Sequence, residues 1–227
     1  MGYSLLVLSL SSCFKMEENE NPQFYSFATV NKIAGSQDSP AHVVFVSDSD
    51  KQIVPLEGTG SLSKLRNGQR CIIYFDIING SPDDNEPVDV KFHYVDTSVV
   101  IGSAVRVKTE EELKKQGDGI LSINIQPYAP QLTPKYFNFY VGYYGTDPAK
   151  HKFSLVYNEA DPGTDKTLYL YLCHDAAQDT NGFQNWHWVS LPVNDMQDLI
   201  TGKDMATVYV QTGVADIQKM DFILKDK

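Results

Sequence analysis

A strict alternation runs through Leu168-Tyr169-Leu170-Tyr171-Leu172, and Tyr136-Phe137-Asn138-Phe139-Tyr140-Val141 alternates in a similar way earlier in the chain. Successive side chains of a β-strand point to opposite faces, so each segment would bury one face and turn the other outward. Five further segments have the β-branched and aromatic content of strands: Ile120–Pro127, Lys152–Asn158, Trp186–Leu191, Ala206–Thr212 and Ile217–Leu224. Seven strands in about 110 residues predict an immunoglobulin-like antiparallel β-sandwich over residues 119–227.

The first half of the chain predicts a second, smaller all-β domain over residues 24–108. Its strand-like segments are Phe24–Ile33, His42–Ser47, Arg70–Ile78, Val88–Val95 and Val99–Val107. Clusters of Ser, Asp, Asn, Gly and Pro at residues 47–50 and 79–85 read as turns. Five strands over about 85 residues favour an OB-like five-stranded barrel, with a small open sandwich as the alternative.

A short helix is predicted at residues 109–118. Thr109 would cap it, with Glu112 at the reciprocal position of a capping box. Glu110 stands four residues before Lys114, which is a favourable spacing for opposite charges on a helix. We expect this helix to form the connection between the barrel and the sandwich.

The N-terminal segment points to export. Leu5-Leu6-Val7-Leu8 is an uncharged apolar run, and Leu10-Ser11-Ser12-Cys13 follows it like the lipobox of a bacterial lipoprotein. In such a protein residues 1–12 are a signal peptide, and the new terminal Cys13 carries the acyl chains that tether the protein to the membrane. The basic residues that usually open a signal peptide are missing here, and the alternative is a buried strand followed by a chance cysteine.

Residues 13–23 would form a flexible, lipid-bearing tether. Lys15 is followed by Glu17, Glu18 and Glu20, which resembles the acidic export signal behind the lipid-bearing cysteine of surface lipoproteins in Bacteroidetes. An ordinary solvated spacer is the alternative. We expect an outer-membrane lipoprotein that is exposed at the cell surface.

The net charge of the chain argues against one class of partner. The 227 residues carry a formal net charge of −10, which repels the phosphates of nucleic acids, so we expect no nucleic-acid partner.

Cys71 and Cys173 remain besides Cys13, and in an exported protein they could pair. Two separate buried thiols are the interpretation we favour.

The sequence motifs that would indicate catalysis or ion binding are incomplete. Gly58-Thr59-Gly60-Ser61 lacks the ending of a phosphate-binding loop, and Asp48-x-Asp50 lacks the later ligands of a calcium loop. The acidic stretch 83–86 offers oxygen donors but reads better as a solvated turn. His174-Asp175 would be half of a metal or acid–base site, but no other histidine has zinc-ligand spacing to it. We expect no metal, no cofactor and no catalytic residue.

Trp186-His187-Trp188 is the one segment with a binding-site pattern. Alternation places Trp186 and Trp188 on the same face of a strand. Facing outward, the two rings would form a stacking platform for sugars; facing inward, they would belong to the sandwich core. The core is the better expectation, because large aromatic side chains dominate protein interiors.

The order of parts resembles the NigD-like lipoproteins of Bacteroides and its relatives. The resemblance rests on the lipobox cysteine, on Phe27-Ala28-Thr29-Val30 and Gly68-Gln69-Arg70-Cys71-Ile72-Ile73-Tyr74-Phe75 in the first domain, and on Leu170-Tyr171-Leu172-Cys173-His174-Asp175 in the second. It covers nearly all of the chain behind the signal segment. It implies an exported lipoprotein and brings no catalytic residues.

These observations predict a non-enzymatic, lipid-anchored envelope protein that acts as a binding or assembly component. Its partner would be an envelope protein or a glycan, and its contact with the membrane would be the N-terminal lipid. The alternatives are a hydrolase acting on glycan or peptide, and an immunity-like protein that masks another envelope protein. A hydrolase needs convergent catalytic groups in a cleft, whereas a masking protein needs a broad exposed apolar patch.

Overall fold

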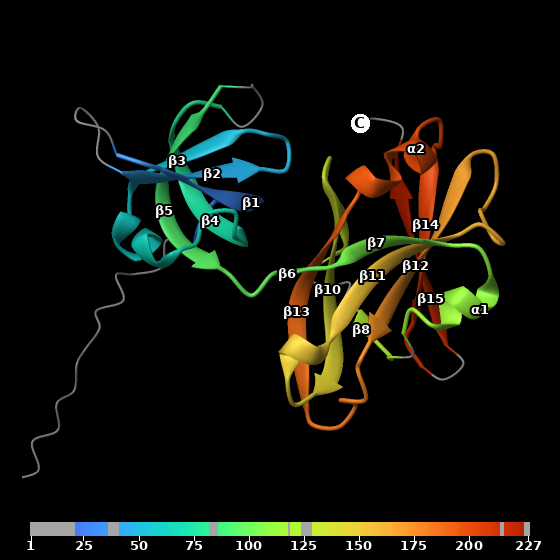
Figure 1. Ribbon diagram of the computed structural model, residues 1–227. Coiled ribbons are helices and arrows are strands. Elements are labelled where there is room, and N and C mark those ends of the chain that lie inside the picture. Colours follow the sequence, from blue (N-terminus) through green and yellow to red (C-terminus); the bar gives the residue numbers. More distant parts are fainter. Residues whose placement is uncertain are drawn as a thin grey trace, which may run out of the picture.

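The structure is a computed structural model of the whole chain, which describes residues 21–35, 41–81, 86–117, 119–123, 129–213 and 216–224. Figure 1 shows a small barrel in blue to green beside a larger sandwich in green to red. Both bodies consist mainly of strands, so the predicted all-β class is confirmed. No helix in the described part of the chain is long and apolar enough to cross a membrane.

The first body is a closed five-stranded barrel with the strand order β1-β2-β3-β5-β4. Its strands are β1 (Phe24–Ile33), β2 (His42–Ser47), β3 (Gln52–Glu57), β4 (Arg70–Asn79) and β5 (Val88–Asp96). A short helix, η1 (Thr59–Lys64), lies between β3 and β4. Alternate residues of the strands, such as Phe45, Ile73 and Val90, point inward and are buried. The predicted barrel is therefore confirmed.

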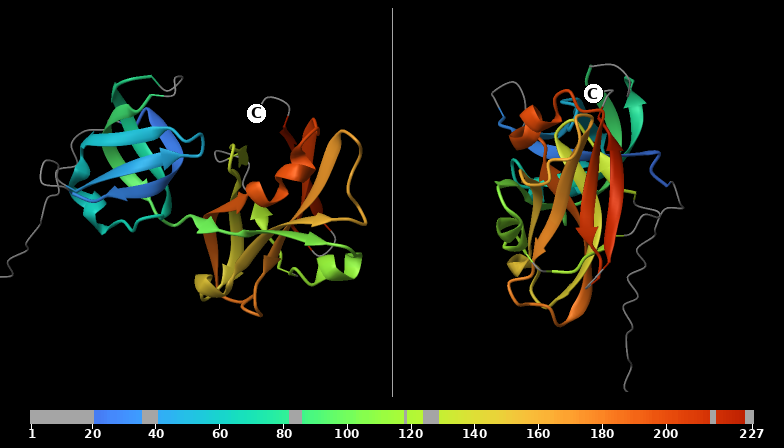
Figure 2. Two further views of the ribbon diagram at one scale, coloured as in Figure 1. Left: turned by 45° about the horizontal axis from the view of Figure 1, so that its top comes forward. Right: turned by 90° about the vertical axis from the view of Figure 1, so that its right-hand side faces the viewer.

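The second body is a sandwich of two sheets. Its elements include β6 (Val100–Ile101), β7 (Ser103–Val107), β8 (Ser122–Ile123), β9 (Gln131–Leu132), β10 (Tyr136–Gly145), β11 (Lys152–Asn158), β12 (Thr167–Asp175), β13 (Phe183–Pro192), β14 (Met205–Gln211) and β15 (Ile217–Ile223). One sheet has the order β6-β13-β10-β8, with β9 also on β10, and the other has the order β15-β14-β12-β11-β7. The views in Figure 2 show these layers from two sides. Leucine, valine and phenylalanine side chains fill the space between the sheets.

The sandwich is mainly antiparallel, but three strand pairs within its sheets are parallel in the described part of the chain. These are β7 with β11, β6 with β13, and β12 with β14. The alternation of Leu168–Leu172 is realised as predicted, since Leu168, Leu170 and Leu172 are buried in the core and the tyrosines between them face outward.

One strand assignment was wrong. The fifth barrel strand is β3, not Val99–Val107, which splits into β6 and β7 and pairs with the sandwich. The sequence conceals β3 because Pro55 lies inside it, and proline lacks the N–H that a strand interior needs. Pro55 is accommodated where the register of β3 against β5 shifts.

The predicted helix forms, but in a different role. Helix α1 (Glu110–Lys114) is capped by Thr109, whose side chain accepts from Glu112 N, while Glu112 Oε2 accepts from Lys108 N at 2.7 Å. Since both β7 and β8 belong to the sandwich, α1 links two sandwich strands and does not connect the domains. The chain passes from barrel to sandwich at residues 97–99 instead. The remaining short helices are η2 (Pro148–Lys150), η3 (Asn194–Met196) and α2 (Gln197–Ile200).

Candidate functional site

The barrel and the sandwich meet through an apolar contact. Phe27 on β1 and Ile72 on β4 point outward from the barrel and pack with Trp188 on β13. All three side chains are buried, and the rings of Phe27 and Trp188 meet edge to face with 5.0 Å between their centroids. Such a contact excludes water from the junction and favours one relative orientation of the two domains.

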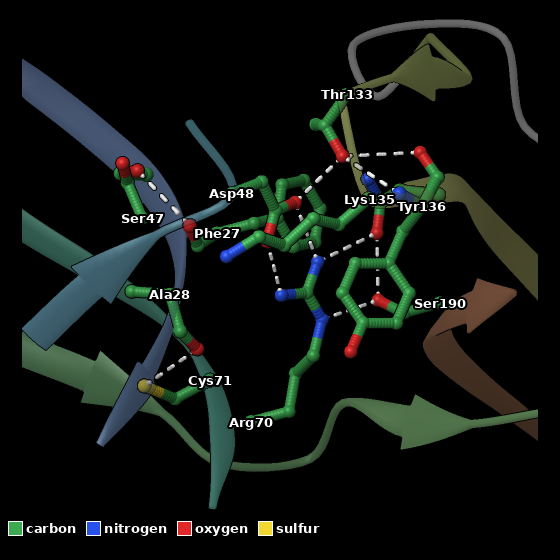
Figure 3. Close-up of polar contacts among 12 residues, drawn as sticks. Phe27, Ala28, Ser47, Asp48, Arg70, Cys71, Thr133, Lys135, Tyr136 and Ser190 are labelled. Atoms are coloured by element: carbon green, nitrogen blue, oxygen red, sulfur yellow. Dashed lines mark hydrogen bonds and ion pairs between the residues drawn. The ribbon is translucent and has the colours of Figure 1, made fainter. Parts of the chain in front are cut away.

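A buried ion pair lies beside this apolar contact (Figure 3). Arg70, at the start of β4, donates to both carboxylate oxygens of Asp48 at 2.6 and 2.8 Å. The Arg70 side chain is only 1% exposed and that of Asp48 6%. A pair removed from water in this way requires the remaining donors and acceptors to be satisfied as well.

Sandwich residues complete the hydrogen bonding of Arg70. Its Nε donates to Ser190 Oγ at 2.9 Å and its Nη2 to Asn138 Oδ1 at 3.1 Å. The guanidinium carbon lies 3.8 Å from the ring centroid of Tyr136. One barrel arginine thus contacts residues from both β10 and β13, which ties its geometry to the docking of the sandwich.

Sandwich residues 131–135, which lie directly before β10, make further contacts with the barrel. Thr133 Oγ1 donates to Asp48 Oδ2 at 2.7 Å, and Lys135 Nζ forms an exposed ion pair with Asp50. Gln131 Nε2 donates to the hydroxyl of Tyr25 at 2.7 Å. Together with the buried pair, these contacts define the junction as a rigid connection between the domains.

A small hollow opens at the edge of the junction. It has a volume of about 270 Å³ and is lined from the barrel by Tyr25, Ser47 and Asp48, and from the sandwich by Gln131 and Thr133. The Asp48 carboxylate at its wall is held by Arg70 and Thr133, so it serves the junction and is not placed as a proton-transfer group.

A row of tyrosines extends from this hollow across the outside of the barrel. Tyr25 on β1 stands opposite Tyr74 on β4, and Tyr74 stands opposite Tyr94 on β5. The ring centroids are 6.1 Å apart in the first pair and 4.2 Å apart in the second, where the rings stack. Tyr25 and Tyr94 are each about half exposed, at 53% and 51%. We call these three residues the tyrosine row.

Trp186 and Trp188 were expected in the sandwich core, with an open platform as the alternative, but they lie on the outer face of their sheet. Both rings contact Tyr140, with centroids at 5.3 Å for Trp186 and 5.4 Å for Trp188. The shared face is as predicted, but Trp188 is 4% exposed and covered by the barrel. Its ring belongs neither to the interior of the sandwich nor to an open platform. Trp186 is half-buried and lies over Gly142, where an added Cβ would come within 2.8 Å of the indole.

The other residues singled out in the sequence have structural roles or lie outside the described residues. Cys13 and the signal segment lie outside the described residues, as does most of the acidic stretch 83–86. Gly58 precedes η1 with a φ of 76°, and an added Cβ would meet Phe92 O at 2.0 Å. Within the described ranges, no group of three or more His, Cys, Asp or Glu is placed to hold a metal ion.

The two remaining cysteines are free thiols in separate domains. Burial raises the pKa of both Cys71 and Cys173 to about 12. Cys71 lies in the barrel core and donates to Ala28 O at 3.6 Å. The interpretation of two unpaired cysteines is therefore confirmed, and neither thiol is activated as a nucleophile.

Sequence reasoning missed the residues that build the junction. Arg70, Asn138 and Ser190 are far apart in the chain, and only the docking of the domains brings them together. Alternation gives no signal for the tyrosine row, because Val88, Val90 and Phe92 point into the barrel and only the register shift between β4 and β5 turns Tyr94 outward. The neighbour relationship of the three tyrosines requires the strand register, which the sequence does not display.

The family follows from a match over more than half of the chain. Residues 105–224 match the model of the NigD-like C-terminal beta sandwich domain. The chain belongs to the NigD-like family. No protein with a curated description is significantly similar to it in sequence.

Solved structures share the fold of this NigD-like chain at low sequence identity. A protein of unknown function from Bacteroides vulgatus has a TM-score of 0.67 at 16% identity, covering 88% of this chain and 90% of that one. A candidate lipoprotein from Bacteroides fragilis has a TM-score of 0.63 at 14% identity, with coverage of 89% and 98%. A NigD-like immunity protein from Bacteroides caccae has a TM-score of 0.55 at 14% identity, with coverage of 88% and 97%. At these identities the likeness shows a common two-domain architecture.

Proposed function

We propose that this NigD-like protein is a non-enzymatic, lipid-anchored protein of the outer membrane, exposed at the cell surface, that binds another envelope protein through the tyrosine row. The observation that carries the proposal is the contiguous arrangement of Tyr25, Tyr74 and Tyr94 on the outside of the barrel. Tyrosine is enriched in protein–protein interfaces, because its ring packs against apolar groups while its hydroxyl keeps a polar partner.

The geometry of the tyrosine row favours a protein as the partner. The rings of Tyr74 and Tyr94 stack at an interplanar angle of 17°, so their facing sides cover each other. The stacked pair forms a ridge with exposed ring edges and hydroxyl groups, and such a ridge fits into a groove between the side chains of a protein partner.

The rigidity of the junction supports a binding role as well. Tyr25 is held by Gln131 of the sandwich, and Tyr74 packs against the cluster of Phe27, Ile72 and Trp188. A surface that is already ordered loses little conformational entropy when a partner binds. The contacts at the junction therefore order the tyrosine row before a partner binds, so binding needs no change of domain orientation.

The position in the envelope is inferred from the N-terminus. The segment that ends at Cys13 has the pattern of a lipobox, and one structural neighbour is a candidate lipoprotein. The name of the Bacteroides caccae neighbour, an immunity protein, supports a protein as the partner. We infer that the partner is another envelope protein, and the neighbour's name suggests masking as the form of binding.

The experiment is capture of partners from envelope extract by the purified protein, followed by a binding measurement with the purified partner. Tyr94→Ser is the test variant, and Phe183→Ser is the matched control, since Phe183 is 84% exposed at the far end of β13. Central aromatic residues of an interface contribute about 2 kcal/mol or more, so we expect Tyr94→Ser to weaken binding at least tenfold. The Phe183→Ser protein should bind like the wild type.

A partner that binds both variants with equal affinity would refute the tyrosine row as the contact surface. Turnover of a glycan or peptide by the purified protein, abolished by a single substitution in a cleft, would replace the binding role with the hydrolase alternative. Phe183→Ser changes an exposed side chain and should keep the folding stability within about 0.5 kcal/mol of the wild type, whereas Tyr94→Ser also removes the stacking on Tyr74 and should cost about 1 kcal/mol.

A further inference from the structure

The last strand of the sandwich, β15, lies at the edge of its sheet (red in Figure 1). One side of β15 pairs with β14, and no strand in the described part of the chain pairs with its other side. An edge strand presents unpaired N–H and C=O groups, which can form a ladder with a strand of another molecule. The free side of β15 is therefore a surface to which a further strand can be added.

The register with β14 shows which residues face the free side. Thr212 N donates to Asp216 O and Leu224 N donates to Asp204 O, and each contact joins directly opposite residues of the same ladder. Because hydrogen-bonded pairs alternate along an antiparallel ladder, the even-numbered residues of β15 bond to β14. The N–H and C=O groups of the odd-numbered residues point away from the sheet. We call these residues the β15 edge; they are Ile217, Lys219, Asp221 and Ile223.

The side chains of the β15 edge lie on the outer face of the sheet. Met220 and Phe222, which alternate with them, are buried in the core, whereas Ile217 is 64% exposed and Ile223 71%. The two charged side chains between the isoleucines are exposed as well. Along the strand, the β15 edge thus carries an apolar, a positive, a negative and an apolar side chain.

This order is complementary to itself in one antiparallel register. When two copies of β15 pair about a two-fold axis at Met220, Lys219 lies opposite Asp221 of the second copy, and Ile217 lies opposite Ile223 of the second copy. Opposite charges in such positions stabilise a strand pair. An axis at Lys219 or at Asp221 would instead place two lysines or two aspartates opposite each other, which is destabilising.

The surroundings of the two charges fit this pairing. Thr207 Oγ1 donates to Asp221 Oδ1 at 2.6 Å, which holds the carboxylate on the outer face and leaves Oδ2 for a second partner. Lys219 Nζ lies 5.1 Å from the ring centroid of Tyr209, so it is on the same face. A lysine on an edge strand commonly prevents pairing with another chain. Here the register at Met220 supplies an aspartate opposite it.

We propose that a second copy of this chain adds its β15 to the β15 edge, so that two sandwiches share one continuous sheet in a two-fold symmetric dimer. Each directly opposite pair of edge residues exchanges two backbone hydrogen bonds, and two pairs of Lys219 with Asp221 fix the register. Ile217 packs against Ile223 at both ends of the ladder. Such an interface uses the same surface on both copies, as most dimers do. It lies on the sandwich and is separate from the tyrosine row of the barrel.

Sedimentation velocity of the purified protein measures this association, with Cys13→Ser in every sample so that no acyl chain can be attached. We expect a reversible monomer–dimer equilibrium in the micromolar range. Lys219→Asp and Asp221→Lys each place like charges opposite each other at two positions, so each should weaken dimerisation at least tenfold. Lys150→Asp is the control, because it makes the same change of charge as Lys219→Asp at an exposed position in η2. It should dimerise like the protein with the native β15 edge.

An equimolar mixture of the two charge-reversal variants gives the sharpest result. In a mixed dimer, position 219 of one chain is negative and faces a positive position 221, while the other pair is the native Lys219 with Asp221. We expect mixing to restore the dimer, which also shows that both variants are folded.

The proposal is overturned if the protein with the native β15 edge remains a monomer at every concentration. It is also overturned if the charge reversals leave dimerisation unchanged, or if the mixture stays monomeric. Each of these results leaves the protein-binding role of the tyrosine row intact, because that row lies on the barrel and is tested by Tyr94→Ser.

Discussion

Arg70 Nη1 donates to Asp48 Oδ1 over 2.6 Å, and both side chains are almost completely buried where the barrel meets the sandwich. Both residues belong to the barrel, yet Ser190 and Asn138 of the sandwich bind the same guanidinium. The pair therefore couples the internal geometry of one domain to its attachment to the other. We expect the two domains to behave as one mechanical unit.

Loss of Arg70 should be costly. Arg70→Met leaves the Asp48 carboxylate buried without its counter-charge, and breaking a buried pair in this way costs about 3–5 kcal/mol. Urea denaturation measures the difference. The control is Arg106→Met, because Arg106 pairs with Asp198 at an exposed site, where ion pairs contribute little to stability. Equal effects of the two substitutions would contradict the account of the junction.

The two tryptophans should differ in their contribution to stability. Trp188→Ala removes a buried ring from the domain contact and should cost about 3–5 kcal/mol. Trp186→Ala removes a half-buried ring and should cost clearly less. The free energies of unfolding from urea titrations compare the variants. A larger loss for Trp186→Ala would show that Trp188 is not the ring that holds the domains together.

Asp179 should make the sandwich sensitive to acid. Hydrogen bonds from Asp147 N and from Thr146 hold its pKa at about 2, below the ordinary 3.8. The folded state therefore binds the proton less readily than the unfolded state, so this contribution is present above pH ~4 and is lost as the pH falls toward 2. Thermal unfolding across this window should show a steeper decline for the wild type than for Asp179→Asn. Parallel curves would contradict the role of the carboxylate.

Cys13 should decide where the protein is found. In cells that export and lipidate the full chain, the protein should partition into the detergent phase and the membrane fraction, because acyl chains contribute about 0.8 kcal/mol for each buried CH₂. Cys13→Ser should move it to the soluble fraction, while Cys173→Ser should leave it at the membrane. A Cys13→Ser protein that stays in the membrane fraction would rule out lipid attachment at this residue.

The sequence predicted the local elements well wherever side chains alternate or turn residues cluster. The bounds of β1, β2 and β11 agree with the predicted Phe24–Ile33, His42–Ser47 and Lys152–Asn158, because each of these strands is rich in β-branched and aromatic residues. It failed at β3, where Pro55 obscures the strand pattern. It also placed Val99–Val107 in the wrong body, because β6 and β7 pair in parallel with strands that come 50 or more residues later.

The candidate sites were harder to predict for a related reason. Alternation placed Trp186 and Trp188 on one face but could not show that a second domain covers Trp188. Docking is decided by side chains from both bodies, such as Phe27 and Trp188, and no local pattern relates them.

The central claim is that the tyrosine row contacts another envelope protein, and photo-crosslinking in living cells tests it most directly. A photoreactive phenylalanine derivative would replace Tyr94 in one strain and Phe183, which is exposed at the far end of β13, in a second strain. We predict that position 94 forms a crosslink to one envelope protein and that position 183 does not. Absence of any crosslink from position 94, or the same products from both positions, would contradict the claim.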